Sequence, residues 1–248
     1  MGRLAVFTAI IIIIAAGLFY AYKRYGILFQ LAPYNTAIDQ SLEQAGFKLG
    51  TPILVRIFKK ESLLEVWQQR DDKFTLFKTY PICTWSGALG PKHREGDKQS
   101  PEGFYIVTKK QLNPNSRYHR AFNIGYPNAY DKQLDRTGSA LMVHGSCVSV
   151  GCYAMTDYQI SEIYRIIEKA FDAGQAEFQI QIYPFRMTKE AMEANKYNPW
   201  LEFWQNLKQG NDLFEASGTP PKAYGCNGVY GFNLSKQEAE KCQPIKGW

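Results

Sequence analysis

The hydrophobic and polar positions change their period several times along the chain. Over residues 34–47 apolar side chains recur at helical spacing and Gly46 stands near the end, which predicts a short amphipathic helix. Beyond this segment the apolar and aromatic positions group into short strand-like runs that charged turns separate. These runs predict a β-meander, and they cover residues 53–58, 62–69 and 74–85.

A loop rich in glycine, proline and charge follows over residues 86–102 and leads into a strand-like run at 103–107. Two more short strands are predicted at residues 120–127 and 139–144. Aromatic residues make up 15% of the chain and cluster in these runs. This composition favours substantial sheet content.

The clearest predicted helix covers residues 155–174. Thr156 can cap its start, Gln159 takes the capping-box position, and Gly174 can end it. Residues 177–185 then alternate apolar and polar side chains as a strand does. From residue 188 the chain reads as helices followed by an irregular tail. There is no internal repeat and no linker to a second domain, so one α+β domain is the simplest architecture.

The N-terminus carries an uncharged run over residues 4–22, which is 19 residues long. As a helix it would span roughly 28 Å, close to the thickness of the hydrocarbon core of a bilayer. We therefore expect residues 1–24 to direct export, either as a membrane anchor or as a cleaved signal peptide. Residues 25–50 would form a tether and the short helix.

The net charge indicates which classes of macromolecule the protein could bind. The chain has a formal charge of +6, from 29 basic and 23 acidic residues. Three of the basic residues belong to residues 1–24, so the remainder has 26 basic and 23 acidic residues, or +3. Without a basic stripe interleaved with aromatics, this balance argues against binding of nucleic acid. A mildly basic surface suits an anionic polymer of the cell envelope.

Five cysteines in an exported chain predict disulfides and one free thiol. We favour pairing of Cys226 with Cys242 and of Cys83 with Cys147, although four cysteines allow three pairings. Cys152 would then remain free. Since neither C-x-x-C nor H-x₃₋₅-H spacing occurs, no metal site is expected.

The stretch "HGSCVSVGCYAMTD", which begins at His144, has an order that suggests nucleophilic chemistry. Ser149 and Gly151 allow a sharp turn that would bring Cys152 to the start of the following helix. There the helix dipole would favour the thiolate. His144, at the end of a strand, could act as general base.

The same stretch also suggests how the other groups would act. The N–H groups of Gly151 and Cys152 could face a developing oxyanion. A backbone carbonyl near Gly145 could orient the imidazole, because no acidic residue stands near enough in sequence. The alternative is structural: His144 as a surface or capping residue and Cys152 in a disulfide, within an inactive, envelope-anchored module that binds peptidoglycan.

A family resemblance bears on this choice. "HGSCVSVGCYAM" resembles the HG…S-x-G-C signature of the L,D-transpeptidase catalytic (YkuD-like) family, and "GDKQSPEGFYIV" resembles the strand segment that precedes it. More narrowly, "SPEGFY", "NIGYPNAYD" and "IYPFRMT" look like the YafK-like branch of Gram-negative envelope proteins. The resemblance covers about residues 51–185.

The resemblance implies a single mixed β-sandwich or barrel domain within the α+β class. Helices would follow the catalytic cysteine, and residues 186–248 would form a helical and irregular C-terminal extension packed on the same domain. The implied location is the periplasm. The implied partners are peptidoglycan stem peptides, a wall-linked lipoprotein, and the inner membrane if the N-terminal helix is retained; no cofactor is expected.

The implied chemistry assigns one role to each residue. Cys152 would attack a stem-peptide carbonyl next to meso-diaminopimelate, and an amine or water would resolve the thioester. His144 would be the general base, Gly151 with Cys152 would supply the oxyanion donors, and Ser149 would hold the loop.

Departures from the family pattern affect substrate binding and the acceptor. Val150 replaces a histidine of the usual S-H-G-C-[IV]-R motif, while Tyr153 and Ala154 replace its hydrophobic-arginine pair. We therefore consider Tyr153 and Arg186 as weak candidates for substrate binding. The span from His144 to Cys152 is also shorter than usual, which narrowly favours cleavage by water over transfer to an amine.

Overall fold

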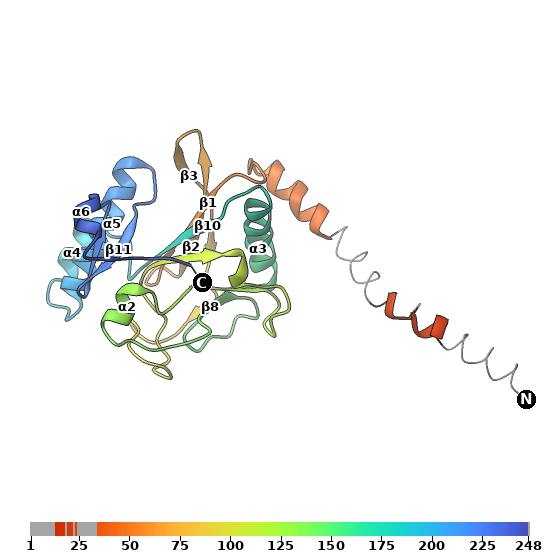
Figure 1. Cartoon of the computed structure of the whole chain (residues 1–248), viewed down its shortest axis with the longest axis horizontal. Helices are drawn as coiled ribbons and strands as arrows, with labels where there is room; N and C mark the ends of the chain where they lie inside the picture. Colours follow the sequence, from red (N-terminus) through yellow and green to blue (C-terminus); the bar gives the residue numbers. More distant parts are fainter. Residues whose placement is uncertain (1–12, 18, 22, 24–33, 248) are drawn as a thin grey trace, which may run out of the picture. The chain divides into compact units, whose positions relative to one another are not determined.

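The computed structural model describes residues 13–17, 19–21, 23 and 34–247 (Figure 1). The chain divides into two compact units, residues 1–46 and 47–248. In the first, residues 34–44 are helical and Gly46 has a φ of 86°, which confirms the predicted helix and its end. None of the helices among the described residues is long and apolar enough to cross a membrane. The expected export segment lies largely outside the described residues.

Five strands of the second unit form a mixed sheet in the order β3-β2-β1-β10-β5. The first three strands are antiparallel neighbours, which confirms the predicted meander. β1 is buried along its whole length and pairs in parallel with β10. The strand bounds are β1 Ile53–Phe58, β2 Leu63–Arg70, β3 Lys73–Pro81, β5 Gly103–Thr108 and β10 Glu177–Tyr183.

A second sheet of short strands carries the stretch that contains Cys152. Its order is β4-β9-β8-β7-β6, and β8 and β9 are parallel. The sequence did not predict β9, which stands between Cys152 and the following helix. The bounds are β4 Thr84–Trp85, β6 Leu112–Asn113, β7 Ala121–Asn123, β8 Met142–His144 and β9 Tyr153–Ala154.

Helix α3 (Asp157–Asp172) joins the two sheets. The Thr156 side chain accepts a hydrogen bond from the Gln159 N–H at 3.2 Å, and Gly174 has a φ of 106°, so both predicted ends are confirmed. The helix packs on β7 and β8 of the second sheet. Toward the first sheet, the Glu162 carboxylate accepts a hydrogen bond from the Tyr80 hydroxyl at 2.6 Å.

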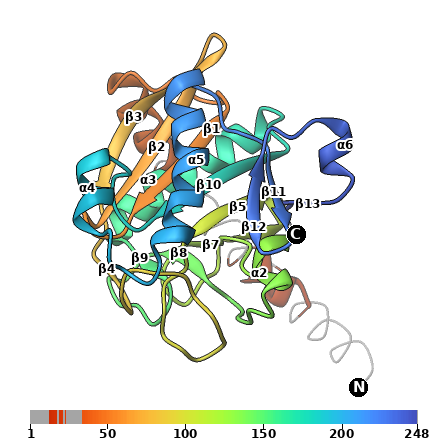
Figure 2. The ribbon, with the colours of Figure 1, turned by 90° about the vertical axis from the view of Figure 1, so that its left-hand side faces the viewer.

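Helix α5 (Leu201–Ser217) covers the other face of the first sheet, and Figure 2 shows it in front of those strands. Arg56 of β1 donates to Asn211 Oδ1 at 2.6 Å beneath it. Both faces of β10 are consequently buried, including the polar positions of its alternating pattern. The shorter helix α4 (Lys189–Ala194) precedes α5.

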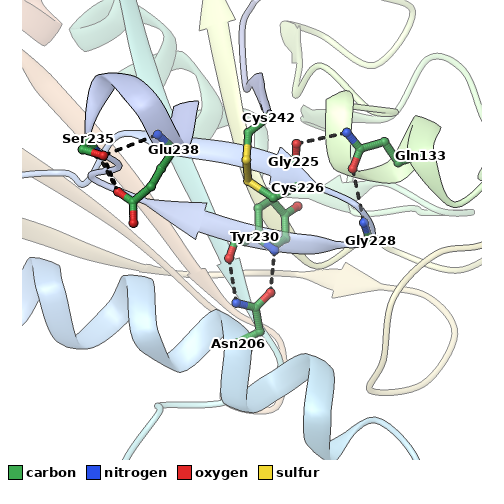
Figure 3. The surroundings of a disulfide bond; sticks show 9 residues. All are labelled: Gln133, Asn206, Gly225, Cys226, Gly228, Tyr230, Ser235, Glu238 and Cys242. Carbon is green, nitrogen blue, oxygen red and sulfur yellow. Dashed lines mark hydrogen bonds between the residues drawn. A yellow bond between two sulfur atoms is a disulfide. The ribbon is translucent and has the colours of Figure 1, made fainter. Parts of the chain in front are cut away.

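The expectation of an irregular tail is wrong, because the C-terminus forms a three-stranded sheet in the order β12-β11-β13. Side-chain amides dock it (Figure 3): Gln133 binds Gly225 O and Gly228 N, and Asn206 binds both the N–H and the carbonyl of Tyr230. Such contacts are long-range and leave no periodic signal in the sequence. The remaining bounds are α2 Ala129–Gln133, η1 Lys109–Gln111, β11 Ala223–Cys226, β12 Val229–Phe232, α6 Lys236–Ala239 and β13 Gln243–Pro244.

Candidate active site

Cys152 is the free thiol, since the other four cysteines form two disulfides. These are the favoured pairs, Cys83 with Cys147 and Cys226 with Cys242, and both are confirmed. The second bridge lies in the C-terminal sheet (Figure 3). The first ties the chain after β3 to the loop between His144 and Cys152.

Removal of the loop disulfide gives a prediction about stability. The Cys83→Ser/Cys147→Ser variant frees two segments that are 64 residues apart in sequence. We expect it to lose about 2–5 kcal/mol of unfolding free energy, because the unfolded chain regains conformational entropy. Calorimetry should show the lower melting temperature, with Lys109→Met, which removes one partner of an exposed ion pair, as the control. Equal melting temperatures for variant and wild type would contradict a stabilising role of this disulfide.

The parallel pairing of β8 with β9 brings the segment of Cys152 alongside the strand that ends at His144. His144 lies opposite Ala154, and Val143 lies opposite Tyr153. Cys152 stands directly before β9, two residues from Ala154. The thiol sits beside the start of β8, where the Met142 N–H donates to Cys152 Sγ at 3.4 Å.

The hydrogen bond of His144 determines its tautomer. Its Nδ1 lies 2.7 Å from the carbonyl oxygen of Gly145. A carbonyl can only accept, so Nδ1 carries the proton and Nε2 keeps its lone pair. Burial lowers the pKa of His144, which keeps the ring neutral at neutral pH. The Tyr118 ring covers the imidazole at a centroid distance of 4.8 Å.

Gly145 is needed at its position for reasons of space. A Cβ there would lie 2.5 Å from Asp157 Oδ1 and 3.0 Å from the Tyr118 carbonyl oxygen. The Gly145 N–H donates to that same Tyr118 carbonyl at 3.0 Å. The residue thus lets the chain pass close to the start of α3 while its own carbonyl orients His144.

The pKa of the Cys152 thiol is raised, chiefly by burial. The Met142 N–H and the positive charge of Lys92 act in the opposite direction. The expected place of Cys152 at the helix entrance is wrong, because β9 and Met155 separate it from α3. The thiol is therefore not activated by a helix N-terminus directly next to it and needs a base to remove its proton.

The two expected oxyanion donors differ in their availability. Gly151 has a φ of 93°, in the region that favours glycine, and its N–H donates to Ser86 Oγ at 2.5 Å. The N–H of Cys152 donates to no other group within the described residues. The amide of Cys152 is thus the open donor, and that of Gly151 is already engaged.

Three serine hydroxyls, those of Ser86, Ser100 and Ser149, bind the backbone of Gly151 and Cys152. Ser149 Oγ donates to the Cys152 carbonyl at 2.7 Å, and Ser100 Oγ donates to the same oxygen at 3.0 Å. Ser86 and Ser100 also pair with each other, since the Ser100 N–H donates to the Ser86 carbonyl at 2.9 Å. The sequence analysis missed Ser86 and Ser100; the place of Ser100 directly before the "PEGF" turn was the available signal.

The side chains of the two candidate substrate-binding residues are both engaged by other groups of the protein. Tyr153 is completely buried, and its hydroxyl donates to the Pro101 carbonyl at 2.6 Å. Arg186 pairs with Glu65 at 2.6 Å and lines a cavity of about 290 Å³ with residues of β1 and α5. The basic residue whose charge acts on Cys152 is Lys92, which is itself buried.

Ligands for a metal are not grouped anywhere in the part of the chain that the structure describes. No cluster of three or more His, Cys, Asp or Glu side chains occurs there. The chemistry available at this place is that of a thiol, an oriented imidazole and a backbone amide.

Comparisons with known proteins identify the family. The model of the "YkuD: L,D-transpeptidase catalytic domain" family matches residues 52–220. YafK of Escherichia coli strain K12, whose name assigns it provisionally to the L,D-transpeptidases, is 47% identical over 182 residues, 73% of this chain and 74% of that protein. YafK of Escherichia coli O157:H7 matches with the same identity over the same shares of both chains.

Among solved structures, the helical cell shape determining protein Pgp2 of Campylobacter jejuni has a TM-score of 0.45 and 16% identity, over 84% of this chain and 98% of that one. Its K307A mutant also has a TM-score of 0.45, with 23% identity over 72% of this chain and 66% of that one. With the family match covering most of the chain, this protein belongs to the L,D-transpeptidase catalytic-domain family.

Proposed function

We propose that this chain acts on peptidoglycan stem peptides by acyl transfer through a thioester at Cys152. The bond attacked would be the peptide bond next to meso-diaminopimelate. The observation that carries the proposal is a free thiol beside strand β8, which ends in a histidine whose Nε2 is left as a base. The place of action would be the periplasm, with residues 1–24 directing export.

In the first step Cys152 Sγ attacks the carbonyl carbon while His144 Nε2 takes the thiol proton. The developing oxyanion would lie against the Cys152 N–H. As the intermediate collapses, the C–N bond breaks, the proton passes from His144 to the leaving amine, and a thioester remains.

In the second step an acceptor attacks the thioester, gives its proton to His144, and releases Cys152 as a thiolate that regains that proton. We favour water as the acceptor. The loop from Gly145 to Gly151 is short, and Val148 and Val150 on it are exposed, so we expect water to reach the thioester although the thiol itself is partly buried. The products would be released crosslinks or a freed wall-linked lipoprotein.

An inactive wall-binding module is the rival interpretation. It gives Cys152 a structural role, yet this cysteine forms no disulfide, and the loop is braced by Cys83 and Cys147 instead. Cys152 is therefore not needed as a structural crosslink of this loop.

The proposal is tested by incubating the purified full chain with isolated sacculi and analysing the muropeptides by mass spectrometry. Lost crosslinks or freed lipoprotein would indicate hydrolysis, and new 3–3 crosslinks would indicate transfer. The matched control is the Cys152→Ala variant. Muropeptides that are identical with wild type, variant and buffer would contradict the proposed function.

A further inference from the structure

Lys59 is a completely buried lysine just after the end of β1. Its ammonium donates to the carbonyls of Ala88, Gly90 and Ser100 at 2.8, 3.1 and 2.9 Å. It also pairs with Glu102 Oε1 at 2.9 Å. All four of these partners of Lys59 belong to the loop of residues 86–102. One ammonium therefore binds residues near both ends of that loop.

Glu102 extends this network to helix α5. Its Oε1 also accepts the Gly90 N–H at 2.7 Å, and its Oε2 accepts the Trp204 Nε1–H of α5 at 2.9 Å. Glu102 is 1% exposed and Trp204 is completely buried. The loop is therefore held between β1 on one side and α5 on the other.

A buried ion pair of this kind is expensive. Desolvation of each charge costs several kcal/mol, and apolar residues of similar volume often stabilise a fold equally well. Burial lowers the pKa of Lys59, against the effect of the Glu102 charge. Because this pair specifies the path of the loop, we look for its role in what the loop positions.

The loop positions the nucleophile. Ser86 at its start accepts the Gly151 N–H, and Ser100 near its end donates to the Cys152 carbonyl. The Lys59 ammonium binds the Ser100 carbonyl directly. Ser100 is thus the one residue that connects the Lys59 ammonium with the Cys152 carbonyl.

We propose that Lys59 and Glu102 are positioning residues for Cys152. Through Ser86 and Ser100 they fix the orientation of the Gly151–Cys152 backbone, and with it the direction of the Cys152 N–H. This inference rests on the proposed thioester chemistry and deepens it. It also assigns a function to helix α5, whose Trp204 holds Glu102 in place.

The test uses the Lys59→Met/Glu102→Gln double variant of the full chain. Both charges are removed together because one alone would leave an unpaired buried charge and risk unfolding. The matched control is Lys109→Met, which removes a lysine from the exposed Lys109–Asp172 pair outside this loop. Trp204→Phe is a second, milder variant, since it keeps an aromatic ring but loses the hydrogen bond to Glu102.

Two measurements distinguish a misplaced Cys152 backbone from a general loosening of the fold around the thiol. Acylation of Cys152 by a carbapenem, followed by intact-mass spectrometry, requires the carbonyl to meet the Cys152 N–H. Alkylation by iodoacetamide requires only an accessible thiol. We expect acylation of the double variant to slow about tenfold or more, and that of Trp204→Phe to slow several-fold, because misplacement of about 1 Å costs up to a hundredfold. Alkylation should stay near the wild-type rate.

A folded double variant, or Trp204→Phe if the double variant does not fold, that is acylated as fast as wild type would overturn the inference. A parallel loss of acylation and alkylation would overturn it as well. A wild-type chain that no carbapenem acylates would instead contradict the proposed function, so the two failures are distinguishable.

Discussion

The Cys152→Ala variant is expected to lose peptidoglycan processing by about 10⁴-fold or more, because removal of a nucleophile leaves no route to a covalent intermediate. Its melting temperature should stay close to that of wild type. Cys152 forms no disulfide, and the loss of one sulfur leaves both bridges in place. Muropeptide release from sacculi measures the activity, and calorimetry measures the stability.

Val150→Ala is the matched control for this experiment. Val150 lies two residues away on the same loop, and its side chain is 72% exposed. This variant should process sacculi like wild type. A Cys152→Ala variant that keeps more than about one hundredth of the activity would rule out the thioester, because other groups of the site supply only a small residual rate.

Replacement of His144 by alanine is expected to lower the rate about 10²–10⁴-fold, the usual contribution of a general base. The thiol depends on this base because burial raises its pKa, so that little thiolate is present at neutral pH. A His119→Gln variant serves as control. His119 binds Ser161 at 2.6 Å, a hydrogen bond that glutamine can also make. Equal losses in both variants would contradict the special role of His144.

The pH dependence of the wild-type rate follows from the same residue. His144 acts as a base only when neutral, and burial lowers its pKa below the ordinary histidine value. The rate should therefore stay constant as the pH falls toward that ordinary value and drop only below it. A rate profile of muropeptide release measures this limb. A midpoint above the ordinary histidine value would contradict the assignment of His144 as the neutral base.

The sequence by itself determined the elements whose signals are local. The short apolar runs of the meander and the caps Thr156 and Gly174 of α3 lie within a few residues of the structure that they specify. The spacing of the cysteines and the "HGSCVSVGC" motif likewise singled out Cys152 and His144. Each of these predictions depended on neighbouring residues alone.

Only the tertiary structure decided what surrounds the thiol. Ser86 and Ser100 reach the Gly151–Cys152 peptide across 65 and 52 residues of chain, and Lys59 reaches Ser100 across 41. Contacts at such separations have no period, so neither helical nor strand spacing could indicate them. The C-terminal hairpin is different, because Asn227 and Gly228, both at positive φ, join β11 to β12 and are a local turn signal that was missed. The long-range reason does explain the two-residue strand β9, which exists because β8 and the distant β4 complete its hydrogen bonds.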